Sequence, residues 1–173
     1  MLARTVRVGR WAGAVALVVS LAACGGGGSG DGDDAAPSLE EWVEQADAIC
    51  AETGAELERV ETPAFLDDPG FDPEAATEEE LAQLADAYEA AFAVQRRDLE
   101  ELRDLTPPED EADAVDAMLD DVEAGLDGYD RAVELLREGD ASGYGAALVE
   151  AAGHFDEAAR AASDLGLEVC GTG

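Results

Sequence analysis

Residues 38–50, SLEEWVEQADAIC, combine a helix start, a buried helix face and the first of two widely separated cysteines. Ser38 with Glu41 three positions later is the capping-box pattern that begins a helix. Apolar residues then recur at helical spacing at Leu39, Trp42, Val43, Ala46, Ile49, Cys50, Leu57 and Val60. This period predicts an amphipathic helix over residues 39–60, with Cys50 beside its apolar stripe.

Residues 61–76, ETPAFLDDPGFDPEAA, interrupt the helical pattern with Pro63, Pro69, Gly70 and Pro73. Proline removes a backbone donor and clashes with the preceding turn, so this segment is predicted to be a loop. We expect Phe65, Leu66 and Phe71 to hold it against the end of the domain.

Three further helices are predicted after the loop. Thr77 to Glu80 repeat the cap pattern, and the helix that follows is predicted to end near Leu105. The sequence TPPE, residues 106–109, breaks the pattern and is expected to start the third helix with proline in its first turn. That helix is predicted to end at REGD, residues 137–140.

The fourth helix is predicted to be capped by Asp140 and stopped by Gly166 in the left-handed conformation. Gly143, Gly145 and Gly153 each weaken it by roughly 1 kcal/mol relative to alanine. Because small residues also permit close approach of helices, we expect this helix to depend on packing.

Four amphipathic helices without a strand pattern predict an all-α four-helix bundle. The connections at residues 106–108 and 138–140 are short, which makes helices two, three and four antiparallel neighbours. The first loop is long enough for either direction, so the up-down-up-down order is favoured and a crossover stays open.

Residues 1–23 are typical of an export signal. Arg4, Arg7 and Arg10 precede the 11-residue apolar run WAGAVALVVSL, which is too short to span a bilayer. The run ends at Leu21-Ala22-Ala23-Cys24, which resembles the lipobox of bacterial lipoproteins. The resemblance implies a diacylglyceryl group on the Cys24 thiol and cleavage before it, which would hold the protein on the outer face of the cytoplasmic membrane. Ordinary secretion with a free Cys24 is the alternative.

Three regions follow from this reading: a signal peptide at residues 1–23, a lipidated Gly/Asp-rich tether at residues 24–37 and a helical domain at residues 38–173. Processing would leave seven arginines, no lysine and 42 acidic residues, a formal charge of −35. Such a charge repels nucleic acid and anionic lipid headgroups. Partners are therefore expected to be cationic or neutral proteins, apart from the membrane that holds the Cys24 lipid.

With Cys24 committed to lipid, Cys50 and Cys170 remain as an even pair in an exported protein, which predicts one disulfide. Its loop of about 120 residues corresponds to a stabilisation on the order of 4–5 kcal/mol from loop-closure entropy. A redox-active or metal-binding pair is the alternative, although the CxxC spacing typical of such pairs does not occur.

A second resemblance rests on WVEQADAICAE, TPPEDEADAV, REGD and LGLEVCG. These motifs are similar to small helical lipoproteins and secreted proteins of actinobacteria, whose paired cysteines stand at the places of Cys50 and Cys170. That family is largely uncharacterised, so the resemblance implies no active site and no cofactor.

Few residues suggest chemistry. His154 is the single histidine, which excludes a di-iron centre with two Glu-x-x-His motifs, and it is interpreted as a surface or interhelical residue. Asp67, Asp68, Asp72 and Glu74 are candidate Ca²⁺ ligands, but their spacing is not that of an EF-hand.

The leading hypothesis is a non-enzymatic, lipid-anchored module that binds a protein or a cell-envelope component. The alternative is a lipoprotein that binds a small ligand or a divalent cation. An enzyme would require a catalytic constellation that the sequence pattern does not indicate.

Replacing Cys24 tests the anchor. Cys24→Ala should abolish metabolic labelling with a fatty acid and release or misprocess the protein, because two acyl chains are needed for stable attachment. Fractionation of membranes with labelled palmitate measures both effects. Unchanged membrane retention of the variant would contradict the lipid anchor.

Overall fold

The computed structural model describes residues 36–170, so the expected signal peptide, Cys24 and most of the tether lie outside the described residues. The elements are α1 Leu39–Leu57, the 3₁₀ helix η1 Ala64–Asp67, α2 Glu78–Asp104, α3 Ala112–Glu138 and α4 Ala141–Leu165. Within residues 36–170 there is no strand, and no helix is long and apolar enough to cross a membrane. The all-α prediction is confirmed.

Side chains identified in the sequence cap three of the helices at their N-termini. The Oγ of Ser38 accepts a hydrogen bond from the backbone N–H of Glu41, whose carboxylate accepts one from the N–H of Ser38. Thr77 and Glu80 form the same reciprocal pair on α2. These hydrogen bonds from the backbone and the hydroxyl lower the pKa of the Glu41 and Glu80 carboxyls. Asp140 caps α4, as predicted.

Some helix ends agree with the sequence pattern, and two differ from it. Gly139 and Gly166 adopt positive φ angles of 77° and 91°, which glycine tolerates and which end α3 and α4. The prediction that α3 begins with proline in its first turn was wrong, because Glu109 to Glu111 form a turn and the helix begins at Ala112. α1 ends at Leu57 rather than Val60, since the last residues form turns with i→i+3 hydrogen bonds.

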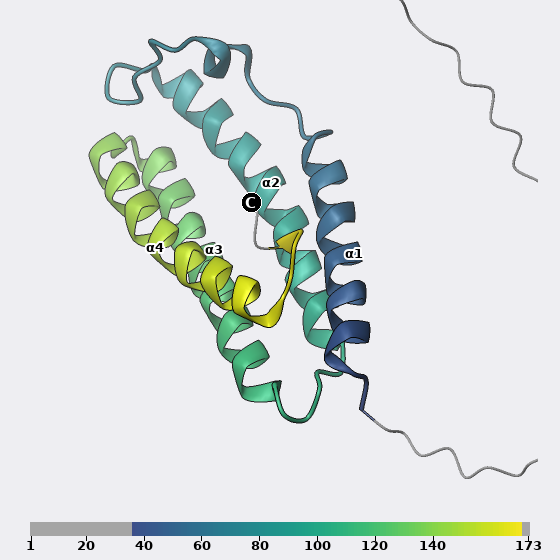
Figure 1. Ribbon diagram of the computed structural model, residues 1–173. Coiled ribbons are helices and arrows are strands. Elements are labelled where there is room, and N and C mark those ends of the chain that lie inside the picture. The colour runs from purple at the N-terminus through teal and green to yellow at the C-terminus, as the bar shows by residue number, and fades with distance from the viewer. Residues whose placement is uncertain (1–35, 171–173) are drawn as a thin grey trace, which may run out of the picture. The chain divides into compact units, whose positions relative to one another are not determined.

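The helices form a bundle in which each runs opposite to the one before it (Figure 1). Extensive packing is confined to sequential pairs: α3 with α4, then α2 with α3, then α1 with α2. The first loop therefore makes no crossover, and the up-down-up-down order is the one observed. The C-terminal segment returns between α4 and α1 (Figure 1).

The buried core has two parts along the bundle axis. The first contains Trp42 and Ala46 of α1 together with residues of α2, α3 and α4 and the tail residue Leu167. The second contains no buried residue of α1 and is covered by Phe65 and Phe71 of the first loop. α1 is 19 residues long and α2 is 27, so α2 extends past the end of its neighbour. The loop takes the place of a helix there.

Two of the three residues expected to hold the first loop do so. The rings of Phe65 and Phe71 lie 4.7 Å apart and pack on the second core cluster. Leu66 is 37% exposed, so its expected role was wrong. A 3₁₀ helix has three residues per turn, so neighbouring side chains point in different directions. Of the neighbours Phe65 and Leu66, only Phe65 faces the core.

α3 approaches α4 closely at two of its glycines. A Cβ added at Gly128 would lie 2.8 Å from Cβ and 3.2 Å from Cα of Ala151 on α4. Gly145 and Gly153 of α4, which were expected to allow close packing, have no atom within 4 Å of such a Cβ. A Cβ added at Gly143 would meet side chains of Asp140 and Leu135, so the glycines at the close contact between α3 and α4 are Gly125 and Gly128 of α3, which face Phe155 and Ala151 of α4.

Arginines link α2 to α3 by reaching across to two acids spaced i, i+3 on the other helix. Arg96 contacts Asp127 and Asp130, and Arg103 contacts Asp120 and Glu123. Arg137 of α3 contacts Asp86 and Glu89 of α2 in the reverse direction. Pairs this exposed contribute little individually, but each arginine offsets repulsion between two nearby carboxylates.

A pair of glycine substitutions tests the close approach. Gly128→Ala should lower the free energy of unfolding by about 1–3 kcal/mol, because the backbone of α4 would have to move. Gly153→Ala should raise it by up to about 1 kcal/mol, because the site is open and alanine favours the helix. Urea denaturation measures both values. Equal effects of the two substitutions would refute the tight α3–α4 contact at Gly128.

Candidate functional site

The disulfide predicted from the cysteine count is present between Cys50 and Cys170. Cys50 lies on α1, and Cys170 lies in the tail after α4, with 5.2 Å between their Cα atoms. Both cysteines pack against the first core cluster, where Leu167 of the tail is buried. The covalent bond therefore joins the last described segment of the chain to the first helix.

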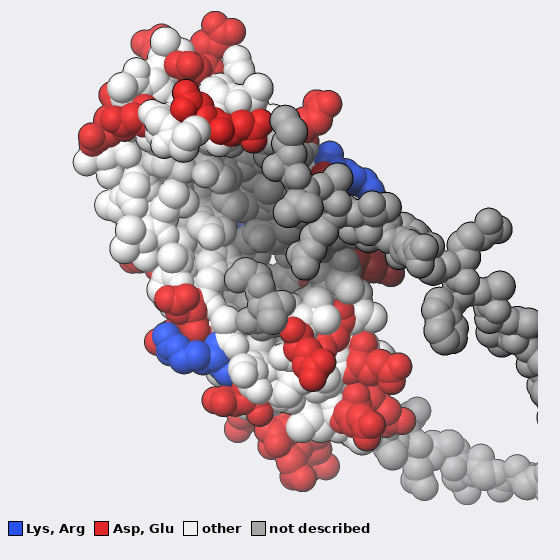
Figure 2. Space-filling model, turned by 45° about the horizontal axis from the view of Figure 1, so that its top comes forward, with Lys and Arg blue, Asp and Glu red and all other residues white. Residues whose placement is uncertain are grey.

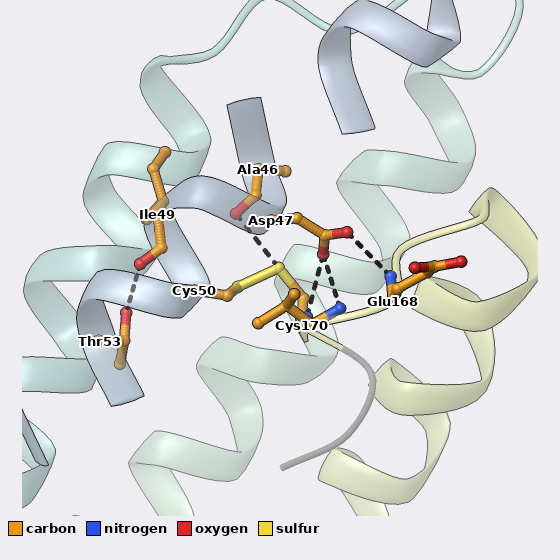
Figure 3. The surroundings of a disulfide bond; sticks show 8 residues. Ala46, Asp47, Ile49, Cys50, Thr53, Glu168 and Cys170 are labelled. Atoms are coloured by element: carbon orange, nitrogen blue, oxygen red, sulfur yellow. Dashed lines mark hydrogen bonds between the residues drawn. A yellow bond between two sulfur atoms is a disulfide. The ribbon is translucent and has the colours of Figure 1, made fainter. Parts of the chain in front are cut away.

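Asp47 binds the same tail through its carboxylate (Figure 3). Its Oδ2 accepts a hydrogen bond of 3.0 Å from the N–H of Glu168. Its Oδ1 accepts bonds of 2.9 Å from Val169 and 3.2 Å from Cys170. One side chain thus satisfies three consecutive backbone donors, which a short tail without secondary structure cannot satisfy internally.

The environment of Asp47 favours its ionised form. Partial burial acts to raise the pKa of the Asp47 carboxyl, but the three backbone N–H groups together outweigh it and hold the pKa below its ordinary value. Asp47 is not part of the apolar stripe of α1. Its spacing from Cys50, three residues along a helix, was the available indication, because such residues share a face.

The candidate Ca²⁺ ligands in the first loop have local structural roles. Asp68 accepts a hydrogen bond from the N–H of Gly70, and Asp72 accepts one from the N–H of Glu74. Both are Asx turns, which fix the loop backbone. The described residues contain no group of three or more metal-ligating side chains, so Asp67, Asp68, Asp72 and Glu74 are not gathered into one ligand set.

His154 lies between helices, at the partly exposed edge of α4. Its Nδ1 is 3.4 Å from an Oδ1 of Asp121 on α3. Both side chains are more than one-third exposed. The contact adds one polar link to the α3–α4 interface, which agrees with the interhelical interpretation.

One buried carboxylate was not anticipated. Asp98 on α2 is 7% exposed, and its Oδ1 accepts a hydrogen bond from Arg97 at 3.2 Å. Its Oδ2 and the Oε1 of Gln95, three residues earlier, have no partner among the described residues. Gln95 and Asp98 lie three residues apart and therefore share one face of α2.

The exposed side of α4 is unusual for so acidic a chain. From residue 142 to residue 153, the exposed residues other than Glu150 are all uncharged: Ser142, Gly145, Ala146, Val149, Ala152 and Gly153. We call these six residues the α4 face. Val149 at its centre is 76% exposed. Figure 2 shows an uncharged band between two acidic regions on this side of the molecule.

A cleft of about 710 Å³ lies where α2 extends past the end of α1. Its lining consists of Val60, Glu61, Thr62 and Pro63 from the segment after α1, and Gln83, Asp86, Ala87 and Ala90 from α2. The hollow is wide open to solvent, so a ligand bound there would stay partly exposed. No residue pattern indicates this cleft, because it arises where α1 ends and α2 continues.

The chain is an acidic four-helix bundle in which a disulfide joins α1 to the segment after α4. No protein-family model matches the chain, and no similar curated protein or solved structure was found. The surfaces described above therefore have to be interpreted from their own chemistry.

Substitution of Asp47 tests its role through pH. Because the pKa of Asp47 is lowered on folding, its stabilisation is present above the ordinary aspartate pKa of about 3.9 and is lost as pH falls through the lower, folded value. Asp47→Asn should lower the free energy of unfolding at pH 7 by about 2 kcal/mol. The difference from wild type should shrink below about pH 4.

Glu44→Gln is the matched control, since Glu44 is an exposed acid on the same helix and its substitution changes the charge equally. Chemical denaturation of the oxidised proteins between about pH 2 and 7 measures the curves. A difference between wild type and Asp47→Asn that does not vary with pH would exclude the proposed contribution of the ionised carboxylate.

Proposed function

We propose that the chain is a lipid-anchored, non-enzymatic helical module outside the cytoplasmic membrane that binds a protein or cell-envelope partner. The anchor part rests on the signal pattern and the Leu21-Ala22-Ala23-Cys24 sequence. The binding part rests on one observation, the α4 face.

The α4 face supports binding because of its contrast with the rest of the chain. A single exposed apolar side chain on a monomer needs no explanation. Val149, however, is surrounded on its helix by uncharged exposed residues, in a sequence of net charge −32. Desolvating these six residues against a partner would cost little, because none of them carries a charge. A neutral protein surface therefore fits it best.

The second candidate function is binding of a small ligand, and the cleft beside α2 favours it. The cleft combines four apolar residues with carboxylate, hydroxyl and amide groups, as small-molecule sites do. The divalent-cation version of this alternative has less support, since the loop acids are engaged in turns.

Matched substitutions of exposed residues test the α4 face. Val149→Asp should abolish recovery of the partner after crosslinking in native membranes, because it places a charge at the centre of the interface. Ala51→Asp on α1 adds the same charge at another exposed helical position and should leave recovery unchanged. Tagged proteins, crosslinking and mass spectrometry provide the measurement.

Circular dichroism of both variants separates misfolding from loss of binding. The proposal fails if the same proteins are recovered with Val149→Asp as with wild type. It also fails if wild type recovers nothing above background.

A further inference from the structure

The cleft between the segment 60–63 and α2 has a definite chemical character. Val60, Pro63, Ala87 and Ala90 provide apolar surface from both sides. Its two charged lining residues, Glu61 and Asp86, are both acidic.

The two acids differ in how far they are already neutralised. Glu61 has no hydrogen bond or ion pair with any described residue and is exposed. Asp86 accepts one contact at its Oδ1, from Nη2 of Arg137 at 3.3 Å, and its side chain is 75% exposed. Arg137 also binds Glu89, so its charge is shared between two carboxylates. The cleft therefore holds an excess of negative charge.

Elsewhere in the domain, a cation is held between two nearby acids. Arg96 lies between Asp127 and Asp130, and Arg103 lies between Asp120 and Glu123. In each case the long aliphatic stem of arginine can cover apolar surface while its charged end reaches the carboxylates. In the cleft, Asp86 already has such a contact with Arg137, which lies outside the lining, whereas Glu61 has no cation of the described residues beside it.

We infer that this cleft binds an organic cation, an ammonium or guanidinium group on a short aliphatic chain, with the charge at Glu61 and Asp86 and the hydrocarbon on Val60, Pro63, Ala87 and Ala90. This assignment rests on the second candidate function and names its ligand class. The hydroxyl of Thr62 and the amide of Gln83 lie in the same lining and offer further acceptors for the N–H groups.

The same chemistry is carried by a free alkylamine and by a lysine side chain of a protein. Both would place a positive charge beside carboxylates that attract it over several ångströms. The two sources differ at the other end of the aliphatic chain: a lysine carries peptide backbone atoms there, and a free amine does not. A free amine can enter the cleft at either end, whereas a lysine must enter with its charged end first.

An NMR titration of the purified mature chain tests the ligand class with three five-carbon probes of similar size: n-pentylammonium, pentan-1-ol and pentanoate. We expect saturable shifts of the backbone amides of residues 60–62 and 83–90 with n-pentylammonium, at least tenfold weaker effects with pentan-1-ol and none with pentanoate. Nα-acetyl-lysine N-methylamide stands for a protein lysine, and its affinity relative to n-pentylammonium identifies the source.

Two variants and one control locate the binding. Glu61→Gln should weaken n-pentylammonium about fivefold, as expected for a partly exposed ion pair. Ala90→Leu should prevent binding by filling the cleft, and leucine is also a good helix former. Glu58→Gln changes the charge equally at an exposed residue outside the lining and should change the affinity less than twofold.

The possible outcomes distinguish failure of the cationic ligand class from failure of small-ligand binding itself. Equal saturable binding of pentan-1-ol and n-pentylammonium in the cleft would overturn the cationic class and leave small-ligand binding in place. The absence of saturable binding by any probe would overturn both. Shifts spread over the acidic surface and reproduced by NaCl at equal ionic strength would show only counter-ion screening and would also overturn the assignment.

Discussion

The attachment of the C-terminal tail to α1 is the contact on which the bundle's closure depends. Extensive packing joins only helices that follow one another in sequence, so without the tail α1 would be held mainly by α2. The tail adds the Cys50–Cys170 bond, the three hydrogen bonds to Asp47 and the buried side chain of Leu167. A linear arrangement of four helices thereby becomes closed, with Trp42 and Ala46 sealed within its first core cluster.

The connection of the tail to α1 contributes more to the stability of this acidic bundle than it would in a neutral protein of the same size. A large negative charge repels itself and favours expanded states, particularly at low ionic strength. The chain counters this locally: several acids cap helices or turns, and Arg96, Arg103 and Arg137 each lie between two carboxylates. These three arginines join α2 to α3. Arg97 joins α2 to Glu56 of α1, and α4 is held to α3 by the close packing at Gly128 and by the contact of His154 with Asp121. The buried side chains of α4 hold it in the bundle, so the fold does not depend on the residues of the α4 face.

Features that depend on a few neighbouring residues were predictable from the sequence. The caps at Ser38 and Thr77 and the stop at Gly166 follow from local hydrogen bonding and backbone conformation, and the structure has all of them. The disulfide could be predicted because cysteine pairing is a matter of count and compartment. The role of Asp47 was harder to predict, because its partners are about 120 residues away and its three-residue spacing from Cys50 is the one local feature that sets it apart from the exposed acids of α1. The cleft was equally hidden, since it results from where α1 ends relative to α2.

The positions of the two candidate surfaces agree with attachment at the beginning of the domain. Ser38 caps the first turn of α1, and the cleft begins just beyond the other end, about 28 Å along a 19-residue helix. The α4 face belongs to the same end of the bundle, because Tyr144 at the start of α4 donates a hydrogen bond to Tyr88 on the first half of α2. If Cys24 carries the lipid, the tether joins the domain at the end opposite to both surfaces. An amine entering the cleft and a protein docking on α4 would then meet the domain at the end remote from Ser38, where the tether is attached.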